Sequence, residues 1–221
     1  MSVFGYNKDC TSKEQILTKV RSAILEKDEK HFTTINLQDD TWLPFDEEDG
    51  VEFTFVKRFK ENGGIFMYFE EMEHFKEAMN QFVEENNWSP LLTTSPYIKE
   101  IFADTDIEFS DDFKDLERKN KVSIIDCECM IAQTGSIMVS DVTAGSRAAY
   151  AFADTLIVVA HPSQIVARMK DALGYMKEKY NDNQPASMTM ISKSTRSTDI
   201  ENTLVVGAYG FKQVALFLVE E

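Results

Sequence analysis

The sequence has few cysteines, and their spacing does not match the usual pattern for binding an iron–sulfur cluster. The three, Cys10, Cys127 and Cys129, cannot all pair in disulfides, which agrees with a reducing compartment. No C-x-x-C spacing is present, so the chain lacks the usual pattern for holding an iron–sulfur cluster. No G-x-G-x-x-G follows a predicted strand, so the usual dinucleotide-binding fingerprint is missing as well.

Basic clusters and long apolar runs are also missing. The 221 residues include 23 basic and 38 acidic ones, for a net charge of −15. Nucleic-acid binding draws most of its affinity from neutralised phosphates, so we expect no nucleic-acid partner. No apolar run approaches the roughly 20 residues of a membrane helix, and residues 1–10 are polar, so we expect neither a membrane span nor a signal peptide. A cytoplasmic location follows as the expectation.

The negative charge is uneven along the chain. Residues 1–120 hold 27 of the 38 acidic side chains, whereas residues 121–221 hold 11 acidic and 9 basic ones. The second half is therefore the less repulsive place for an anionic ligand.

Alternating strand and helix patterns predict an α/β fold with a mostly parallel sheet covered on both faces. We expect helices at residues 11–27, 51–62, 71–86 and 96–102, the second of which stops at the glycines 63–64. A further helix is expected to begin at Pro162-Ser163, with Ile165, Met169, Leu173 and Met176 facing inward. Strands are expected at residues 65–69 (buried), 90–94, 122–132 (central), 136–139, 155–160, 187–191 and 214–219. Residues 31–49 are predicted to be a linker.

Cysteine and histidine side chains offer weak candidate sites. Cys127 and Cys129 lie two apart in a predicted strand, so both should point to one face. They could form a metal pair, but buried core cysteines are the favoured interpretation. His31 and His74 are scattered, and His74 is expected at the surface. His161 closes a strand, where α/β sheets place ligands.

A tight turn at Gln133-Thr134-Gly135, followed by Ser136, has two interpretations. Backbone N–H groups in such a turn can bind an anion. Alternatively, the turn is a plain hairpin that needs glycine for a positive φ. The residue pattern alone favours neither.

The stretch "STRSTDIENTLVVGAYG" has the composition of a small-anion pocket. Arg196 supplies a forked cation, the neighbouring hydroxyls supply donors, and Glu201 could act as an acid or base if desolvated. Asp199 could cap backbone donors. Alternatively, Arg196 pairs with Asp199 or Glu201 and only braces the fold. The candidate ligand-binding residues are Gln133, Thr134, Gly135, Ser136, Ser194, Thr195, Arg196, Ser197, Asp199, Gly207 and Gly210.

Three segments, "IAQTGSIMV", "SQIVARMKDAL" and "ISKSTRSTDIENTLVVGAYG", resemble the LUD-domain family, in particular its lactate-utilisation protein C group. The order and spacing agree from about residue 122 onward. Departures from the family pattern are Gln133, Phe152-Ala153, Lys193-Ser194 and Tyr209-Gly210-Phe211. The resemblance implies a three-layer α/β/α domain like ribose-5-phosphate isomerase and the CoA transferases. It divides the chain into an N-terminal helical arm and linker, residues 1–49, and a LUD domain, residues 50–221.

The resemblance also implies a function. Members of the family work with iron–sulfur subunits that oxidise L-lactate to pyruvate. On this hypothesis the chain is a non-redox subunit, it holds no cofactor or metal itself, and the clusters belong to partner subunits. The alternative is a stand-alone enzyme or sensor that binds a small phosphorylated or carboxylated metabolite. Whether the chain catalyses a reaction alone, and whether it forms a homo-oligomer, are left open.

Overall fold

A computed structural model describes residues 18, 50–112, 121–197, 205–207 and 210–220 of the chain. The chain divides into two units, Met1–Asp40 and Thr41–Glu221, and every element below belongs to the second. Of the predicted first helix only Thr18 is described, and it is helical. The predicted linker and the residues Cys10, His31, Asp199 and Glu201 lie outside the described residues.

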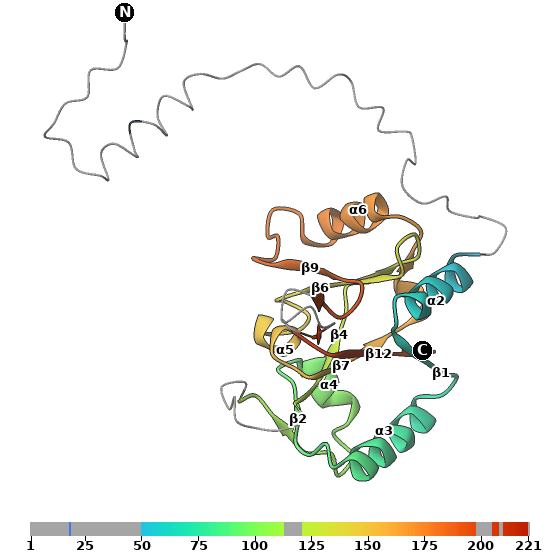
Figure 1. The fold of residues 1–221 in the computed structure, drawn as a ribbon, viewed down its shortest axis with the longest axis vertical. Coiled ribbons are helices and arrows are strands. Elements are labelled where there is room, and N and C mark those ends of the chain that lie inside the picture. Colours follow the sequence, from blue (N-terminus) through green and yellow to red (C-terminus); the bar gives the residue numbers. More distant parts are fainter. Residues whose placement is uncertain (1–17, 19–49, 113–120, 198–204, 208–209, 221) are drawn as a thin grey trace, which may run out of the picture. The chain divides into compact units, whose positions relative to one another are not determined.

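Six parallel strands form the central sheet in the order β1-β12-β7-β4-β2-β3 (Figure 1). Their bounds are β1 Ile65–Phe69, β2 Leu91–Leu92, β3 Phe109–Ser110, β4 Val122–Asp126, β7 Thr155–Ala160 and β12 Gln213–Val219. The inner strands β7 and β12 are almost wholly apolar, as expected for parallel strands covered on both faces. The predicted α/β fold with a mostly parallel sheet is confirmed.

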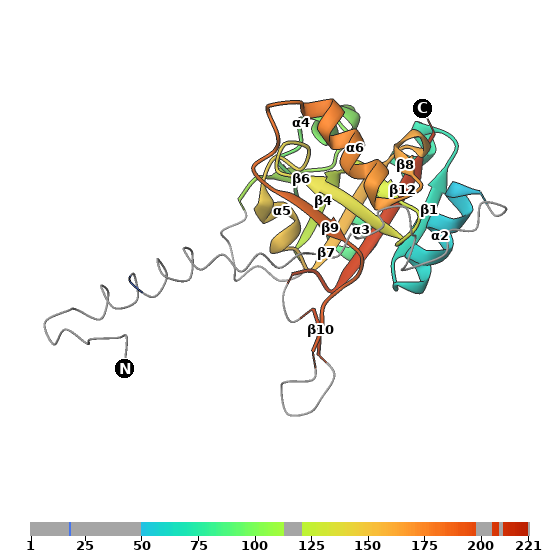
Figure 2. The same ribbon diagram turned by 90° about the horizontal axis from the view of Figure 1, so that it is seen from above.

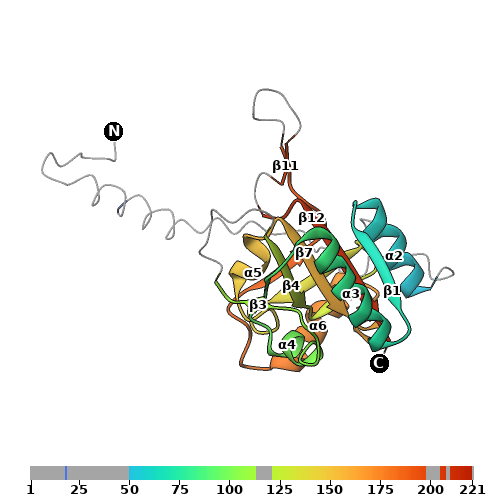
Figure 3. The ribbon, with the colours of Figure 1, turned by 90° about the horizontal axis from the view of Figure 1, so that it is seen from below.

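Helices cover one face of this sheet, as seen from below in Figure 3. They are α3 (Met72–Asn86) and α4 (Pro96–Ile101). Phe75 and Ile98 from these helices share a core cluster with Ile124, Ile157 and Phe217 of the sheet. The strand residues in this cluster alternate along β4, β7 and β12, because successive side chains of a strand point to opposite faces.

A second, four-stranded sheet covers the other face, together with two helices (Figure 2). Its order is β8-β5-β6-β9, with bounds β5 Cys129–Ile131, β6 Ser136–Ser140, β8 Ile165–Val166 and β9 Met188–Ile191. The helices are α2 (Val51–Glu61) and α5 (Arg147–Ala151), and α6 (Met169–Tyr180) packs on the outer side of the second sheet. The sequence patterns did not reveal that the apolar strands belong to two sheets.

The apolar run of residues 122–132, predicted as one strand, forms two. β4 ends at Asp126 in the central sheet, and β5 begins at Cys129 in the second sheet. Cys127 and Cys129 are buried and unpaired, as predicted for core cysteines. They enter different core clusters and not one face, because the chain leaves the central sheet between them. Apolar content cannot reveal this break, since both strands are buried.

Two further predictions need correction. The helix expected at Pro162 begins at Met169, because Pro162–Gln164 form a 3-10 turn and Ile165–Val166 pair with β5. Leu173 is consequently 52% exposed and does not face inward. β1 lies at the edge of the sheet and is not fully buried: Ile65 and Tyr68 are exposed, since the strand pairs only with β12.

Candidate functional site

The order of strands reverses direction between β2 and β4. From β2 the chain moves outward to β3, whereas from β4 it moves through β7 to β12 on the other side. In open parallel sheets, ligands bind outside the carboxyl ends of the strands at such a reversal. Here that place lies after β2, where Thr93 and Ser95 are buried, and at Asp126, the last residue of β4.

Asp126 carries a buried carboxyl oxygen, Oδ1, that has no hydrogen-bond partner among the described residues. Ser95, the N-cap of α4, lies close enough to the Asp126 side chain to lower its pKa by hydrogen bonding. Burial and the negative charge of Glu128 raise the pKa of Asp126, and the Ser95 hydrogen bond and Lys179 only partly oppose them. Asp126 is therefore a carboxyl group that holds its proton more tightly than an exposed aspartate.

A histidine–tyrosine pair lies at the same edge of the sheet. His161 follows β7, and its Nδ1 is 2.9 Å from the carbonyl oxygen of Val219. A carbonyl only accepts hydrogen bonds, so Nδ1 of the neutral ring carries the proton and Nε2 is the acceptor. Tyr97 of α4 therefore donates its hydroxyl to Nε2, at 2.5 Å. Tyr97 is 37% exposed, so this pair borders the solvent. We call Ser95, Asp126, Tyr97 and His161 the carboxyl-edge cluster.

Gln164 ties the two strand ends of this cluster together. Its Oε1 accepts a hydrogen bond from the backbone N–H of His161 at 2.7 Å. Its Nε2 donates to the carbonyl oxygen of Cys127 at 2.8 Å. The amide side chain thus holds the ends of β7 and β4 in fixed register, which positions His161 and Asp126.

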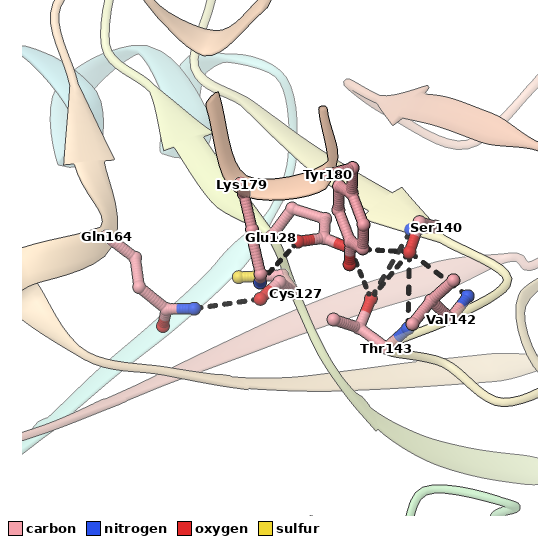
Figure 4. A network of polar contacts seen from close by, with 8 residues as sticks. All are labelled: Cys127, Glu128, Ser140, Val142, Thr143, Gln164, Lys179 and Tyr180. Atoms are coloured by element: carbon pink, nitrogen blue, oxygen red, sulfur yellow. Dashed lines mark hydrogen bonds and ion pairs between the residues drawn. The ribbon is translucent and has the colours of Figure 1, made fainter. Parts of the chain in front are cut away.

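Glu128, next along the chain, forms a closed polar network (Figure 4). Its Oε1 accepts hydrogen bonds from Tyr180 at 2.7 Å, Ser140 at 2.5 Å and Thr143 at 3.3 Å, and its Oε2 lies 2.8 Å from Nζ of Lys179. Burial alone would raise the pKa of Glu128, but these hydrogen bonds and the Lys179 charge outweigh it and lower that pKa. Both oxygens are satisfied, so this network fastens α6 to the second sheet and leaves no carboxylate oxygen open to a ligand.

The predicted turn at Gln133-Thr134-Gly135 joins β5 to β6 and packs on α2. The three backbone N–H groups donate to Ala167, Ile131 and Ala132 carbonyls, in that order. Gly135 has a φ of +59°, and a Cβ there would lie 2.5 Å from the backbone of Arg58 and Phe59. The positive φ is what the hairpin interpretation requires, and the close approach of α2 gives a second reason for glycine. Oγ1 of Thr134 is buried and has no partner among the described residues.

Arg196 and this turn adjoin the same end of α2. Asn62 donates to the carbonyl oxygens of Thr134 and Gly135 at 2.9 and 3.3 Å, and a Cβ on Gly63 would lie 3.9 Å from Nη2 of Arg196. Ser136 hydrogen-bonds Ser192 at 2.7 Å, which links the turn to the segment before Arg196. α2 leads into β1, so these predicted residues gather at the amino-terminal edge of the sheet, opposite the carboxyl-edge cluster.

Arg196 and Ser197 belong to one short ribbon, and Gly207 directly follows it. β10 (Arg196–Ser197) pairs with β11 (Val205–Val206), and the N–H of Gly207 donates to Thr195 at 2.8 Å. Ser194 is half-buried, and Gly207 and Gly210 both have positive φ. Asp199 and Glu201 lie outside the described residues, so the pairing of Arg196 with either stays a prediction.

Sequence reasoning missed three members of the carboxyl-edge cluster. Only His161 was considered, because it closes a strand. A polar residue that ends an apolar run, as in "SIID", and the Ser-Pro that opens α4 were signals for Asp126 and Ser95. Nothing in the sequence indicated that Tyr97 meets His161, 64 positions further along the chain. His74, expected at the surface, is exposed beside Glu71.

The described part of the chain shows neither a metal cluster nor a membrane-spanning helix. It contains no group of three or more His, Cys, Asp or Glu side chains placed to hold a metal ion. None of its helices has the length and apolar character needed to cross a membrane.

The fold and its polar strand ends define an α/β protein of the parallel-sheet class. The model of the LUD domain matches residues 54–219, so the chain belongs to the LUD-domain family. This bears out the resemblance in the sequence.

Individual relatives match more locally. The lactate utilization protein C of Geobacillus thermodenitrificans is 27% identical over 109 residues, 48% of this chain and 45% of the relative. The protein of that name from Bacillus licheniformis is 29% identical over 96 residues, 42% of this chain and 40% of the relative. The matched part thus spans less than half of each relative. The crystal structure of a DUF162 family protein from Deinococcus radiodurans has the same fold, with a TM-score of 0.58, 16% identity, and 80% of this chain and 99% of that chain covered.

Proposed function

We propose that this chain serves in lactate utilisation as a non-redox subunit, beside iron–sulfur subunits that oxidise L-lactate to pyruvate. The observation that carries the proposal is membership of the LUD-domain family, together with two relatives named lactate utilization protein C. The positions of Cys127 and Cys129 fit this role, because their thiols lie in the core. Burial raises the pKa of both, and a thiol must lose its proton to ligate iron.

The ligand site of this proposal is the amino-edge cluster, which we define as Arg196, Thr134 and the serines Ser136 and Ser192. The Arg196 fork matches a carboxylate with two parallel hydrogen bonds. The unpaired Oγ1 of Thr134 and the hydroxyls of Ser136 and Ser192 supply donors near the same end of α2. A 2-hydroxy or 2-oxo acid carries the carboxylate that this cluster would bind.

Growth and association experiments test the role in the native host. We expect deletion of the gene to abolish growth on L-lactate as sole carbon source, with normal growth on glucose as the control. We also expect a tagged chain to recover an iron–sulfur protein from lactate-grown cells. Normal growth on lactate after deletion, with no iron–sulfur protein recovered, would contradict the proposal.

A second candidate function is a stand-alone enzyme or sensor for a small metabolite. The observation that favours it is the carboxyl-edge cluster, where the pKa of Asp126 is raised by burial and His161 presents an acceptor nitrogen. A thermal-shift screen of sugar phosphates, 2-hydroxy acids and acyl-CoA compounds tests it on the purified chain. A ligand present at 100 times its Kd should add about 2.7 kcal/mol of stability. The absence of any shift at millimolar concentrations would count against this function.

A further inference from the structure

The lactate-utilisation role uses the amino-edge cluster and does not involve the carboxyl-edge cluster of Ser95, Asp126, Tyr97 and His161. We propose that this second cluster is a binding site for a small hydroxy or oxo compound, held by Oδ1 of Asp126 and Nε2 of His161. This inference rests on the second candidate function, for which it names the ligand class and the two binding atoms, and it is independent of the first, since it needs neither a partner subunit nor Arg196.

The geometry brings the two binding groups to one face of the sheet. Asp126 pairs with Val159 in the register of β4 and β7, and His161 follows Val159 by two residues. Side chains two apart on an extended segment share a face, so Asp126 and His161 both point towards α4. Strand geometry places their Cα atoms about 8 Å apart, a span that one small molecule can bridge. Contacts with Ser95 and Tyr97, both in or next to α4, agree with this placement.

Asp126 can serve both the hydroxyl and the carbonyl form of a ligand. Oδ1 of Asp126 is the buried atom that lacks a partner in the described structure, so it is the carboxyl oxygen that a ligand would meet. A protonated Oδ1 donates to a carbonyl oxygen, and an ionised Oδ1 accepts from a hydroxyl. Leaving such a buried oxygen unpaired costs free energy that a ligand oxygen would recover. The nearby negative charge of Glu128 disfavours a ligand that would place a carboxylate beside Asp126.

His161 provides the second contact, and a hydrogen bond to the backbone fixes which of its ring nitrogens accepts. Val219 holds the proton on Nδ1, so Nε2 accepts hydrogen bonds, and Tyr97 now fills that position. Tyr97 borders the solvent, so a ligand hydroxyl can replace the phenol as the donor without opening the core. The site therefore recognises one oxygen at Asp126 and one hydroxyl at His161.

Carbon-13 NMR of labelled aspartate side chains tests this inference on the full chain, with dihydroxyacetone as the probe, because it carries a carbonyl oxygen and a hydroxyl and has no carboxylate. We expect a millimolar probe to shift the Asp126 carboxyl signal and to stabilise the protein against heat. Asp126→Asn should remove the Asp126 carboxyl signal. Asp126→Asn and His161→Gln should each weaken probe binding about 10-fold, because each change alters one hydrogen bond at a charged or polarised group. Asp182→Asn, an exposed aspartate in the turn after α6, is the matched control and should bind like the wild type.

The outcomes separate this site from the amino-edge cluster. Stabilisation by a probe that survives Arg196→Ala but is weakened by Asp126→Asn supports the carboxyl-edge site whatever the growth phenotype. An Asp126 signal that the probe does not move means that an internal water alone satisfies Oδ1, and this overturns the inference. Probe binding that Asp126→Asn and His161→Gln leave unchanged also overturns it, and loss only in Arg196→Ala assigns the probe to the amino-edge cluster.

Discussion

Lys179 lies 2.8 Å from Glu128, and this contact joins an exposed helix to a buried strand end. The Glu128 side chain has no exposed surface, whereas that of Lys179 is 38% exposed. Lys179 thus reaches from the surface of α6 and places its positive charge beside the buried carboxylate of Glu128, directly before β5. Because Tyr180, Ser140 and Thr143 hold the same carboxylate, α6 is attached by polar contacts as well as by Ala172 and Met176.

Removing Lys179 should destabilise the protein moderately. Lys179→Met leaves a buried carboxylate with only hydroxyl donors, and we expect a loss of about 2–3 kcal/mol, below the 3–5 typical of a fully buried pair because solvent screens the lysine. Urea unfolding at neutral pH measures it. Glu128→Gln combined with Lys179→Met should lose less than the sum of the single changes. Additive losses would show that the two side chains do not interact.

Asp126→Asn should remove a pH dependence of stability. The folded-state pKa of Asp126 is raised above the ordinary 3.8, so the folded chain binds more protons than the unfolded chain between those two values. The contribution of Asp126 is therefore fully present below pH 3.8 and is lost as pH rises through the raised pKa. The charged groups that act on the Asp126 carboxyl are Glu128 and Lys179, and, besides burial, the charge of Asp126 in turn raises the pKa of Cys127.

The measurement compares free energies of unfolding from about pH 4 to about pH 8. We expect the wild type to lose stability relative to Asp126→Asn as pH rises, with a constant difference once Asp126 is ionised. The Asp182→Asn control should follow the wild type at every pH. A wild-type advantage that grows with pH would mean that Asp126 is stabilised as an anion.

Two glycine-to-alanine changes should have opposite effects on stability. Gly135→Ala places a Cβ against the α2 backbone at a φ of +59°, and we expect a loss of about 2–5 kcal/mol from strain and overpacking. Gly174 lies in α6, and a Cβ there meets nothing within 4 Å. Gly174→Ala should therefore gain about 0.5–1 kcal/mol, because alanine favours helix. Thermal unfolding of both variants checks the prediction, and a neutral Gly135→Ala would contradict the close packing of the turn on α2.

Arg196→Ala separates ligand binding from a structural role. If Arg196 binds a carboxylate, the variant should melt like the wild type and lose the stabilisation by L-lactate or pyruvate. Lys193→Ala, an exposed cation three residues earlier, is the control and should keep that stabilisation. A loss of about 0.5–1 kcal/mol in the ligand-free variant, the size expected for an exposed ion pair, would instead mean that Arg196 braces a carboxylate.

Cys127 and Cys129 should react with thiol reagents only after unfolding. Burial raises the pKa of both thiols, that of Cys129 to about 12, so almost no thiolate is present at neutral pH. In a Cys10→Ser variant, an aromatic disulfide reagent should release no colour from the folded chain and two equivalents in denaturant. Rapid reaction of the folded variant would show that one of the two strand ends opens to solvent.

Local pattern was enough to identify most elements of the fold. Residues 155–160 and 213–219 are apolar at every buried position, so length and composition predicted strands near their observed bounds. Helix α3 shows its buried stripe of Phe75, Met79 and Val83 at helical spacing. Family motifs then identified the LUD domain, because the order of turn, helix and hydroxyl-rich loop is a property of the chain itself.

Only the tertiary structure decided which strands share a sheet and which polar groups meet. The run of residues 122–132 is equally apolar on both sides of its break, so the change of sheet at Cys127 leaves no trace in composition. Tyr97 and His161 are 64 positions apart, and Glu128 and Tyr180 are 52 apart. Hydrophobic periodicity reports how one segment faces the core, whereas a polar site depends on the register and order of strands distant in the chain. That order becomes fixed only when the two sheets pack.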